Sequence, residues 1–404
     1  MSAGFLRTAI ILGLISAVGP FAIDMYLPAL PSIGADLGAS IGAVQMSLLA
    51  FFAALAVGQV FVGPLADMYG RKAPLYAGLI LFALGGVGSA LAPTAEWLIA
   101  FRFVQGVGAC AGMVVPRAIV RDLHTGAEAA RLMALLMLVF SISPILAPLT
   151  GSVVIEAFGW RAVFWVVTGA AIAGMVLLAT MISETRPPEL RVGSGFGSAL
   201  AGYRLLMKDR TFLGLSFIGS FGVASFFIYL SSSSFVMIDH YGMTPTGFSM
   251  AFSVNAVGFF AMAQLTGWLT GRYGLARVVR TAVTGYASVM TALLAVFLAG
   301  IDSLAVLMAL LFVGYGFLGL VIPSTAVLAL EDHGAIAGTA SALMGTLQFV
   351  TGAVAMLVAG LFFDGTPLPM VAGIAGAALI AFVLTQLTLG KRPAQPVVGQ
   401  MPAE

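Results

Sequence analysis

The chain has 404 residues, of which 60% are hydrophobic and only 8% are charged. A soluble globular protein carries about 25% charged residues, so the composition excludes soluble classes and predicts an all-α membrane protein. The net charge of +2 gives no indication of a nucleic-acid partner.

Charged residues divide the chain into twelve stretches of low charge, and each approaches or exceeds the about 20 residues that a membrane-spanning helix needs. The first stretch, 8–23, is the shortest. At 1.5 Å per residue it covers about 24 Å of a hydrocarbon core about 30 Å thick, which places Asp24 just inside the outer membrane boundary. The twelve stretches are 8–23, 37–66, 73–95, 97–116, 132–155, 162–183, 211–238, 241–271, 281–301, 303–330, 334–363 and 365–390.

The basic residues set the predicted orientation. Sixteen of the 18 lysine and arginine residues fall at or near cytoplasmic ends if the N-terminus lies inside. Cytoplasmic loops of membrane proteins carry this excess of positive charge. We therefore expect both termini to be cytoplasmic.

The longest internal connection, 184–210, predicts a division into two halves. It is rich in arginine and proline and then carries apolar residues at helical spacing, which is typical of an amphipathic helix on the membrane surface. Two short sequences recur at matching places, 63–70 with 267–274 and 112–116 with 319–323, as in duplicated transporter folds. We predict two pseudo-symmetric six-helix bundles at 1–183 and 211–390, the linker 184–210 between them, and a cytoplasmic tail at 391–404.

Two charged residues fall at membrane depth. Arg102 lies in the otherwise uncharged stretch 97–116, where a guanidinium costs about 2.5–3.5 kcal/mol on insertion scales and needs a partner. Asp24 has a similar predicted depth, and a carboxylate facing Arg102 reduces the cost of burial. The alternatives are a solvated Asp24 at the outer end of the first span, and a structural ion pair or carbonyl clamp for Arg102.

Two further segments have a physical reading of their own. In 63–75, glycines permit a tight turn, and Asp67 and Arg71 are spaced to form an ion pair that can break in a gate; a charged loop that only sets topology is the alternative. In the fifth span, Pro148 bends a helix whose small residues allow close packing; an ordinary proline kink is the alternative.

These segments resemble signature motifs of the major facilitator superfamily. The loop match consists of Gly63, Leu65, Ala66, Asp67, Gly70, Arg71 and Lys72, with Met68 in place of the usual arginine. Arg102–Ala109 is similar to the second motif of the family. Ser143–Ser152, with Pro144, Pro148 and Gly151, resembles the antiporter motif, although Ala147 and Ser152 replace glycines.

The end of the first span, Asp24–Pro31, and Gly338–Ala342 are similar to the bicyclomycin and chloramphenicol resistance (Bcr/CflA-type) branch of drug:proton antiporters. The resemblance implies a multi-pass protein of the bacterial inner membrane, expected to be a monomer. It implies export of small, largely apolar drugs in exchange for protons, with Asp24 as the proton carrier, and with antiporter-type packing of the fifth span that blocks leak.

The partners expected are a small-molecule drug, protons and the lipid bilayer. A drug pocket combines apolar walls with a few polar groups, although helix packing or lipid contact is the alternative for each aromatic residue. No histidine has a partner at metal-ligand spacing, and we expect all three to be solvent-exposed, while Cys110 is expected to be a small packing residue. The candidate pocket residues are Tyr26, Gln59, Phe226, Tyr229, Asn255, Tyr315 and Gln348.

The chain contains no phosphate-binding loop of the Gly-x-x-x-x-Gly-Lys-Ser/Thr type. We therefore expect no cofactor and a proton gradient as the energy source. The alternatives are a metabolite facilitator or proton symporter of the same fold, a membrane enzyme, which needs clustered acids or histidines at membrane depth, and a sensor or scaffold, which normally carries a soluble effector domain.

Overall fold

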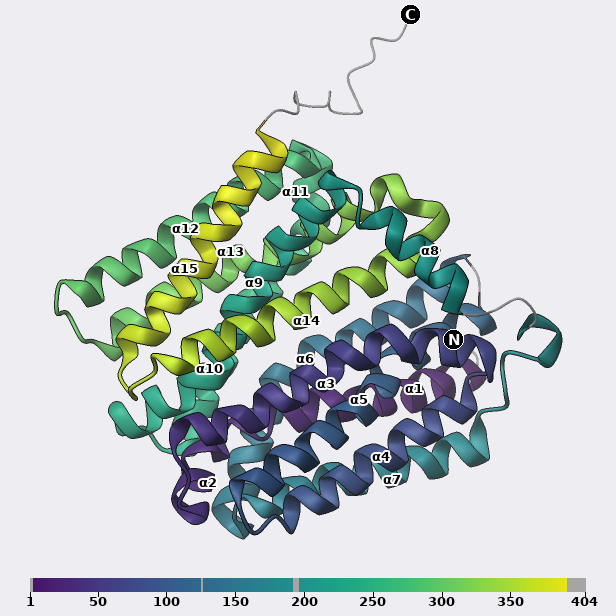
Figure 1. Cartoon of the computed structure of the whole chain (residues 1–404), viewed down its shortest axis with the longest axis horizontal. Coiled ribbons are helices and arrows are strands. Elements are labelled where there is room, and N and C mark those ends of the chain that lie inside the picture. The colour runs from purple at the N-terminus through teal and green to yellow at the C-terminus, as the bar shows by residue number, and fades with distance from the viewer. Residues whose placement is uncertain (1–2, 125, 192–195, 391–404) are drawn as a thin grey trace, which may run out of the picture. The chain divides into compact units, whose positions relative to one another are not determined.

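The computed structural model describes residues 3–124, 126–191 and 196–390, which form helices and connections without a strand (Figure 1). The predicted tail at 391–404 lies outside the described residues. The helices are α1 (Ala3–Asp24), η1 (Leu27–Ala29), α2 (Leu30–Leu37), α3 (Ile41–Met68), α4 (Lys72–Ala90), α5 (Ala95–Leu123), α6 (Gly126–Phe158), α7 (Arg161–Met181), η2 (Pro188–Arg191), α8 (Phe196–Leu206), α9 (Arg210–Ser234), η3 (Phe235–His240), α10 (Pro245–Gln264), α11 (Thr266–Tyr273), α12 (Leu275–Leu298), α13 (Leu304–Leu330), η4 (Glu331–Ile336), α14 (Ala337–Leu361) and α15 (Pro367–Leu389).

Within the described residues, twelve helical segments are long and apolar enough to cross a membrane, which confirms the predicted number of spans. The short helix α8 falls within the predicted linker, where an amphipathic helix was expected. Several helices extend beyond the uncharged stretches: α5 continues through Arg117 and Arg121 to Leu123. A helix does not end at its first charged residue, because long side chains can reach water from within it.

The predicted end of the first span is wrong. The helical path continues after Asp24 through η1 and α2, so that the segment Phe5–Leu37 has 33 residues. Asp24 is only 5% exposed and lies inside this segment rather than at its end. The sequence prediction took the carboxylate as a boundary, whereas the chain buries it.

Close contacts group the chain into two compact units. The first comprises Met1–Ala201 and Ser234–Ser253, and the second comprises Gly202–Ser233 and Val254–Glu404. In the first unit α5 packs against α1, α3, α4 and α6, and α1 also packs against α6 and α7. In the second unit α12 packs against α13 and α15, and α11 against α12 and α13.

Glycines allow α5 to touch its neighbours through backbone atoms. A Cβ atom at Gly106 would lie 2.5 Å from the carbonyl oxygen of Phe51 in α3, and one at Gly108 would lie 2.3 Å from the backbone nitrogen of Phe82 in α4. A backbone atom cannot swing aside as a side chain does. Small residues at these positions are therefore a condition for the close packing that holds membrane helices together.

The two sequence repeats share a turn geometry. Gly70, which follows α3, has a φ angle of 88°, and Gly274, which follows α11, has a φ angle of 80°. Side chains other than hydrogen rarely tolerate this region. The repeated glycine thus has a positive φ angle just after a helix in both units.

Candidate proton and drug-binding site

Asp24 lies at the last residue of α1, where the α-helix gives way to η1. Its Oδ2 atom accepts a hydrogen bond of 3.3 Å from the hydroxyl of Ser143, a residue of α6 that is itself buried. Ser143 directly precedes Pro144, the first proline of the predicted antiporter motif. The candidate proton carrier and that motif therefore meet through one hydrogen bond.

The motif in α6 also packs closely on the chain around Asp24. Pro144 and Pro148 both lie inside α6, and a Cβ atom at Gly151 would lie 2.4 Å from the carbonyl oxygen of Met25. Gly151 thus lets α6 approach the backbone one residue after Asp24. This contact agrees with the close packing that the small residues predict.

Arg102 is completely buried in the second turn of α5. Its Nη1 atom donates to Gln105 Oε1 at 2.7 Å and to the carbonyl oxygen of Ala22 at 3.3 Å. Three aromatic rings surround the guanidinium: its Cζ atom lies 4.3 Å from the ring centre of Phe51, 4.6 Å from that of Tyr26 and 5.8 Å from that of Phe164. Ring faces attract a cation, by about 2 kcal/mol or more when water is excluded.

The predicted ion pair between Asp24 and Arg102 is absent among the residues that the structure describes. Arg102 instead donates to the carbonyl oxygen of Ala22, two residues before Asp24 on α1, while Asp24 accepts from Ser143. In the described part of the chain, the Nε and Nη2 atoms of Arg102 have no hydrogen-bond partner. The carbonyl clamp that the sequence left open is the arrangement observed.

Tyr26 is one of the three aromatic residues around the guanidinium of Arg102. Its hydroxyl is 2.7 Å from Ser47 Oγ, and its ring lies 5.5 Å from that of Phe164. It is therefore fixed between α3, α5 and α7. Gln59, a second candidate pocket residue of the first unit, is half-buried on α3.

The predicted gate segment forms a network of charges at the start of α4. Arg71 pairs with Asp67 at 2.7 Å and binds Asp122 of α5 through two nitrogen atoms, at 2.7 and 3.2 Å. Lys72 donates to the carbonyl oxygen of Ile182 at 2.6 Å. The Asp67–Arg71 spacing predicted the first of these contacts, whereas Asp122 was not foreseen.

Arg186 adds a second guanidinium beside Asp67. Its Nη1 atom lies 3.5 Å from Asp67 Oδ1, and its Nε atom donates to the carbonyl oxygen of Asp67 at 3.0 Å. Met68 stands where the family motif usually has an arginine. Arg186, which lies more than 100 residues later, supplies a positive charge at that place.

Glu184 caps the N-terminus of α4. Its two carboxylate oxygens accept from the backbone N–H groups of Arg71 at 2.8 Å and Lys72 at 3.0 Å. Burial raises the cost of ionising Glu184, but the N–H groups of Arg186, Arg71 and Lys72, with the charge on Arg191, outweigh it and lower the pKa. A carboxylate at a helix N-terminus also meets the positive end of the helix dipole.

Replacing Glu184 with glutamine is expected to reduce the free energy of unfolding by about 1 kcal/mol at neutral pH, as for the loss of a helix cap. Because folding lowers the pKa of Glu184, its contribution is fully present above the ordinary value of about 4.3 and is lost as the pH falls through the lowered value. Thermal unfolding in detergent across this pH range measures the difference between the two proteins. Glu189→Gln, at an exposed position of η2, is the control, and a difference for Glu184→Gln that persists unchanged in acid contradicts the prediction.

In the second unit the structure gathers four of the candidate pocket residues. The rings of Tyr229 in α9 and Tyr315 in α13 lie 5.2 Å apart, and Phe226 lies 6.0 Å from Tyr315. Asn255 in α10 donates to the Tyr229 hydroxyl at 3.1 Å. Gln348 is half-buried on α14, where its amide nitrogen lies 3.7 Å from the Cβ position of Gly219.

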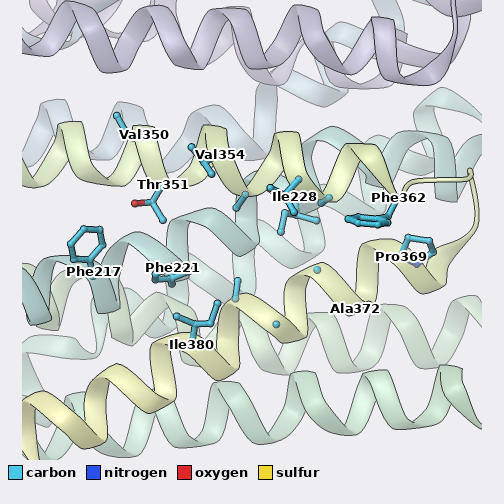
Figure 2. A pocket seen from close by; sticks show the side chains of 16 residues that line it. Phe217, Phe221, Ile228, Val350, Thr351, Val354, Phe362, Pro369, Ala372 and Ile380 are labelled. Atoms are coloured by element: carbon cyan, nitrogen blue, oxygen red, sulfur yellow. The ribbon is translucent and has the colours of Figure 1, made fainter.

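A groove with a volume of about 590 Å³ lies between α9, α14 and α15 of the second unit (Figure 2). Thr351 is the one lining residue with a hydrogen-bonding side chain, and none of the candidate pocket residues lines it. Such a lining suits hydrocarbon but offers little to orient a polar ligand. The labelled residues are Phe217, Phe221 and Ile228 from α9, Val350, Thr351, Val354 and Phe362 around α14, and Pro369, Ala372 and Ile380 from α15.

The described residues contain no group of three metal-ligating side chains. Only His240 is exposed as expected, while His124 and His333 are half-buried. The imidazole of His124 lies 3.0 Å from Glu128, and that of His333 lies 3.2 Å from Asp209. Cys110 is buried, and its Cβ atom is 2.8 Å from the Cβ position of Gly58, so it fills a tight helix contact.

Ionisable groups buried among membrane spans mark functional sites, and this chain buries the carboxyl of Asp24 and the guanidinium of Arg102. Residues 12–356 match the model of the Major Facilitator Superfamily. The chain belongs to this family of transporters and is not an enzyme.

Similar proteins agree with this assignment. The chain is 37% identical to the uncharacterized MFS-type transporter YdgK of Bacillus subtilis over 90% of this chain and 91% of that protein. It is 32% identical to a bicyclomycin resistance protein homolog of Haemophilus influenzae, over 94% and 95%, and 29% identical to a chloramphenicol resistance protein of Pseudomonas aeruginosa, over 68% and 64%.

Solved structures share the fold at low sequence identity. The xylose transporter XylE of E. coli superposes with a TM-score of 0.72 at 13% identity, covering 96% of this chain and 98% of that one. A bacterial homolog of the lysosomal transporter Spinster gives 0.74 at 16% identity, with 98% and 99% covered. These similarities confirm the fold class predicted from the sequence.

Proposed function

We propose that the protein exports small, largely apolar drugs of the phenicol or bicyclomycin type from the cytoplasm in exchange for protons. It acts as a multi-pass protein of a bacterial inner membrane with both termini in the cytoplasm. The observation that carries the proposal is the buried carboxyl of Asp24, which is bound to Ser143 of the proline-containing helix α6. The names of the relatives, which include bicyclomycin and chloramphenicol resistance, support the substrate class.

The chemistry of the site suits proton exchange. A carboxyl group with one protein hydrogen bond can change its protonation when its surroundings change. Arg102 keeps its proton and stays a fixed positive charge close by, with two nitrogen atoms open to a further acceptor in the described part of the chain. Ala22 of α1 already contacts Arg102, and Asp24 is only two residues further along the same helix. Ionised Asp24 is therefore the acceptor that we expect these open nitrogen atoms to bind.

Alternating access then couples the two flows. When Asp24 is protonated, its contact with Ser143 persists and Arg102 is held by Gln105 and Ala22. When it is ionised, the open N–H groups of Arg102 attract it, which changes the contact between α1 and α6. We propose that the drug binds only one of these two arrangements of α1 and α6, so that drug and proton compete.

The test is a flux measurement in proteoliposomes loaded with labelled chloramphenicol. An external buffer more acidic than the lumen is expected to speed the loss of drug beyond the rate at equal pH, and a protonophore is expected to remove the difference. Protein-free liposomes correct for passive leak. A drug flux that does not respond to the pH gradient, or that follows protons in the same direction, contradicts antiport.

A further inference from the structure

We propose that Tyr229, Asn255 and Tyr315 of the second unit form a polar subsite that binds the hydrogen-bonding end of the drug. The subsite selects neutral compounds that carry a hydrogen-bond donor and an acceptor next to an aromatic ring, such as aryl amides and aryl alcohols. The inference rests on the proposed function, because it names the chemistry of the substrate that is carried.

Three different helices build the polar subsite. Tyr229 comes from α9, Asn255 from α10 and Tyr315 from α13, and each side chain is at most 2% exposed. The two tyrosine rings meet at 5.2 Å with an angle of 60°, and Phe226, one turn before Tyr229, stands edge-on to Tyr315 at 6.0 Å. Asn255 Nδ2 donates to the Tyr229 hydroxyl at 3.1 Å, which fixes the direction of its amide.

Two polar atoms of the subsite have no partner within the described residues: the hydroxyl of Tyr315 and the Oδ1 atom of Asn255. Each buried group left without a hydrogen bond costs about 1–3 kcal/mol. Buried polar groups without a hydrogen bond are uncommon in folded proteins, and each calls for an explanation. A ligand that supplies the missing partners is such an explanation.

Another buried tyrosine of the same unit has a hydrogen-bond partner within the protein. The hydroxyl of Tyr286 in α12 donates to Ser225 Oγ at 2.5 Å, and Tyr286 is as deeply buried as Tyr315. The open hydroxyl of Tyr315 is therefore not a general consequence of placing tyrosine among these helices. Tyr286 also provides the matched control for any substitution of Tyr315.

The chemistry of the open atoms defines the ligand. Asn255 Oδ1 only accepts, so the ligand must bring an O–H or N–H group, while the Tyr315 hydroxyl can donate to a carbonyl or hydroxyl oxygen. The rings of Phe226, Tyr229 and Tyr315 favour a flat aromatic body in stacked or edge contact. None of these four side chains carries a formal charge, so nothing among them compensates a charged ligand.

The experiment compares Tyr315→Phe with Tyr286→Phe, using labelled chloramphenicol as the probe, a neutral aryl compound with hydroxyl and amide groups. Equilibrium binding to the purified full chain is measured without a pH gradient. Tyr315→Phe is expected to raise the Kd by about five- to tenfold, equivalent to one lost hydrogen bond. Its unfolding temperature is expected to stay the same or to rise, because an unsatisfied hydroxyl has been removed.

Tyr286→Phe is expected to show the opposite pattern. Its unfolding temperature falls, because Ser225 loses its donor, and its Kd stays within about twofold of wild type, since no ligand contact is lost. Asn255→Leu gives a second measurement and is expected to raise the Kd as well. Tyr315→Phe that binds chloramphenicol as wild type does, or that loses as much stability as Tyr286→Phe, overturns the proposal.

The two proposals fail in different ways. Wild-type protein that binds chloramphenicol in the polar subsite but shows no flux coupled to protons contradicts antiport and leaves the subsite standing. Wild-type protein with proton-driven efflux and an unaffected Tyr315→Phe variant contradicts the subsite and leaves antiport standing. Wild-type protein that binds no aryl amide or aryl alcohol also overturns the subsite.

Discussion

Replacing Asp24 with asparagine is expected to abolish drug efflux driven by a pH gradient. Asparagine keeps the shape of the side chain and an oxygen that can accept from Ser143, but it has no proton to exchange. One proton entering at about 100 mV contributes about 2.3 kcal/mol, which supports a drug concentration ratio of about 40- to 50-fold. Cells that carry Asp24→Asn are expected to lose this factor in chloramphenicol export while the protein accumulates normally.

Asp36→Asn is the matched control for Asp24→Asn. Asp36 lies in the same helical segment but on an exposed surface, where it pairs with Arg161 at 2.5 Å, and such exposed pairs contribute only about 0.2–1 kcal/mol. This variant is expected to retain export. Exchange of labelled for unlabelled drug without a gradient shows whether Asp24→Asn still binds drug. Gradient-driven efflux at the wild-type rate in Asp24→Asn removes Asp24 from the mechanism.

Replacing Arg102 with lysine is expected to lower transport at least tenfold. The planar guanidinium lies against the rings of Phe51 and Tyr26 and reaches both Gln105 and the Ala22 carbonyl. An ammonium is compact and more strongly hydrated, so it neither stacks in the same way nor spans these partners. Initial rates of efflux from proteoliposomes measure the loss.

Arg102→Met separates charge from packing. Because Arg102 has no ion pair among the described residues, methionine leaves no opposite charge unpaired and removes a buried guanidinium with two nitrogen atoms that lack a hydrogen bond. Arg102→Met is therefore expected to unfold at the wild-type temperature or above it and to transport nothing. Arg161→Lys, at an exposed ion pair, is expected to change neither property. A variant Arg102→Met that transports normally, or that fails to fold, assigns Arg102 a structural role only.

The sequence was sufficient for the membrane spans, because the hydrophobic effect of a bilayer requires long uncharged stretches. It failed at Asp24, where the rule that charge ends a span does not hold for a carboxyl that the protein buries. The continuation through η1 and α2 was not visible in the charge pattern. Only the packing of α6 against this region, at Ser143 and Gly151, explains why the chain can keep a carboxyl there.

The hydrogen-bond partner of Arg102 could not be predicted from the sequence for a different reason. Counting residues along helices predicts depth, and Asp24 and Arg102 had matching depths. Which way each side chain points depends on the rotation of α1 and α5 about their axes, and this rotation brings the Ala22 carbonyl, not Asp24, to the guanidinium. Tyr26 was assigned to a drug pocket on composition alone, whereas its ring covers the guanidinium.

The sequence predicted one contact of the gate network but not the contacts of Arg71 with distant residues. Asp67 and Arg71 are four residues apart, so helical spacing predicted their contact. Asp122 and Glu184 are 51 and 113 residues from Arg71 in the chain, and no local pattern links positions so far apart. The roles of the gate and antiporter motifs in transport stay predictions, as does the domain division at 184–210.

The glycine contacts of α5 limit where the first unit can deform. α3 and α4 meet α5 backbone to backbone at Gly106 and Gly108, so no side chain separates the helices at these two points. We expect these three helices to move together through a transport cycle. The helical ladder of the first unit is interrupted at the junction after Asp24, and prolines lie inside α1, α3, α5 and α6. The candidate proton carrier therefore lies beside an interruption of the helical ladder, where we expect a change in its charge to alter the path of the chain.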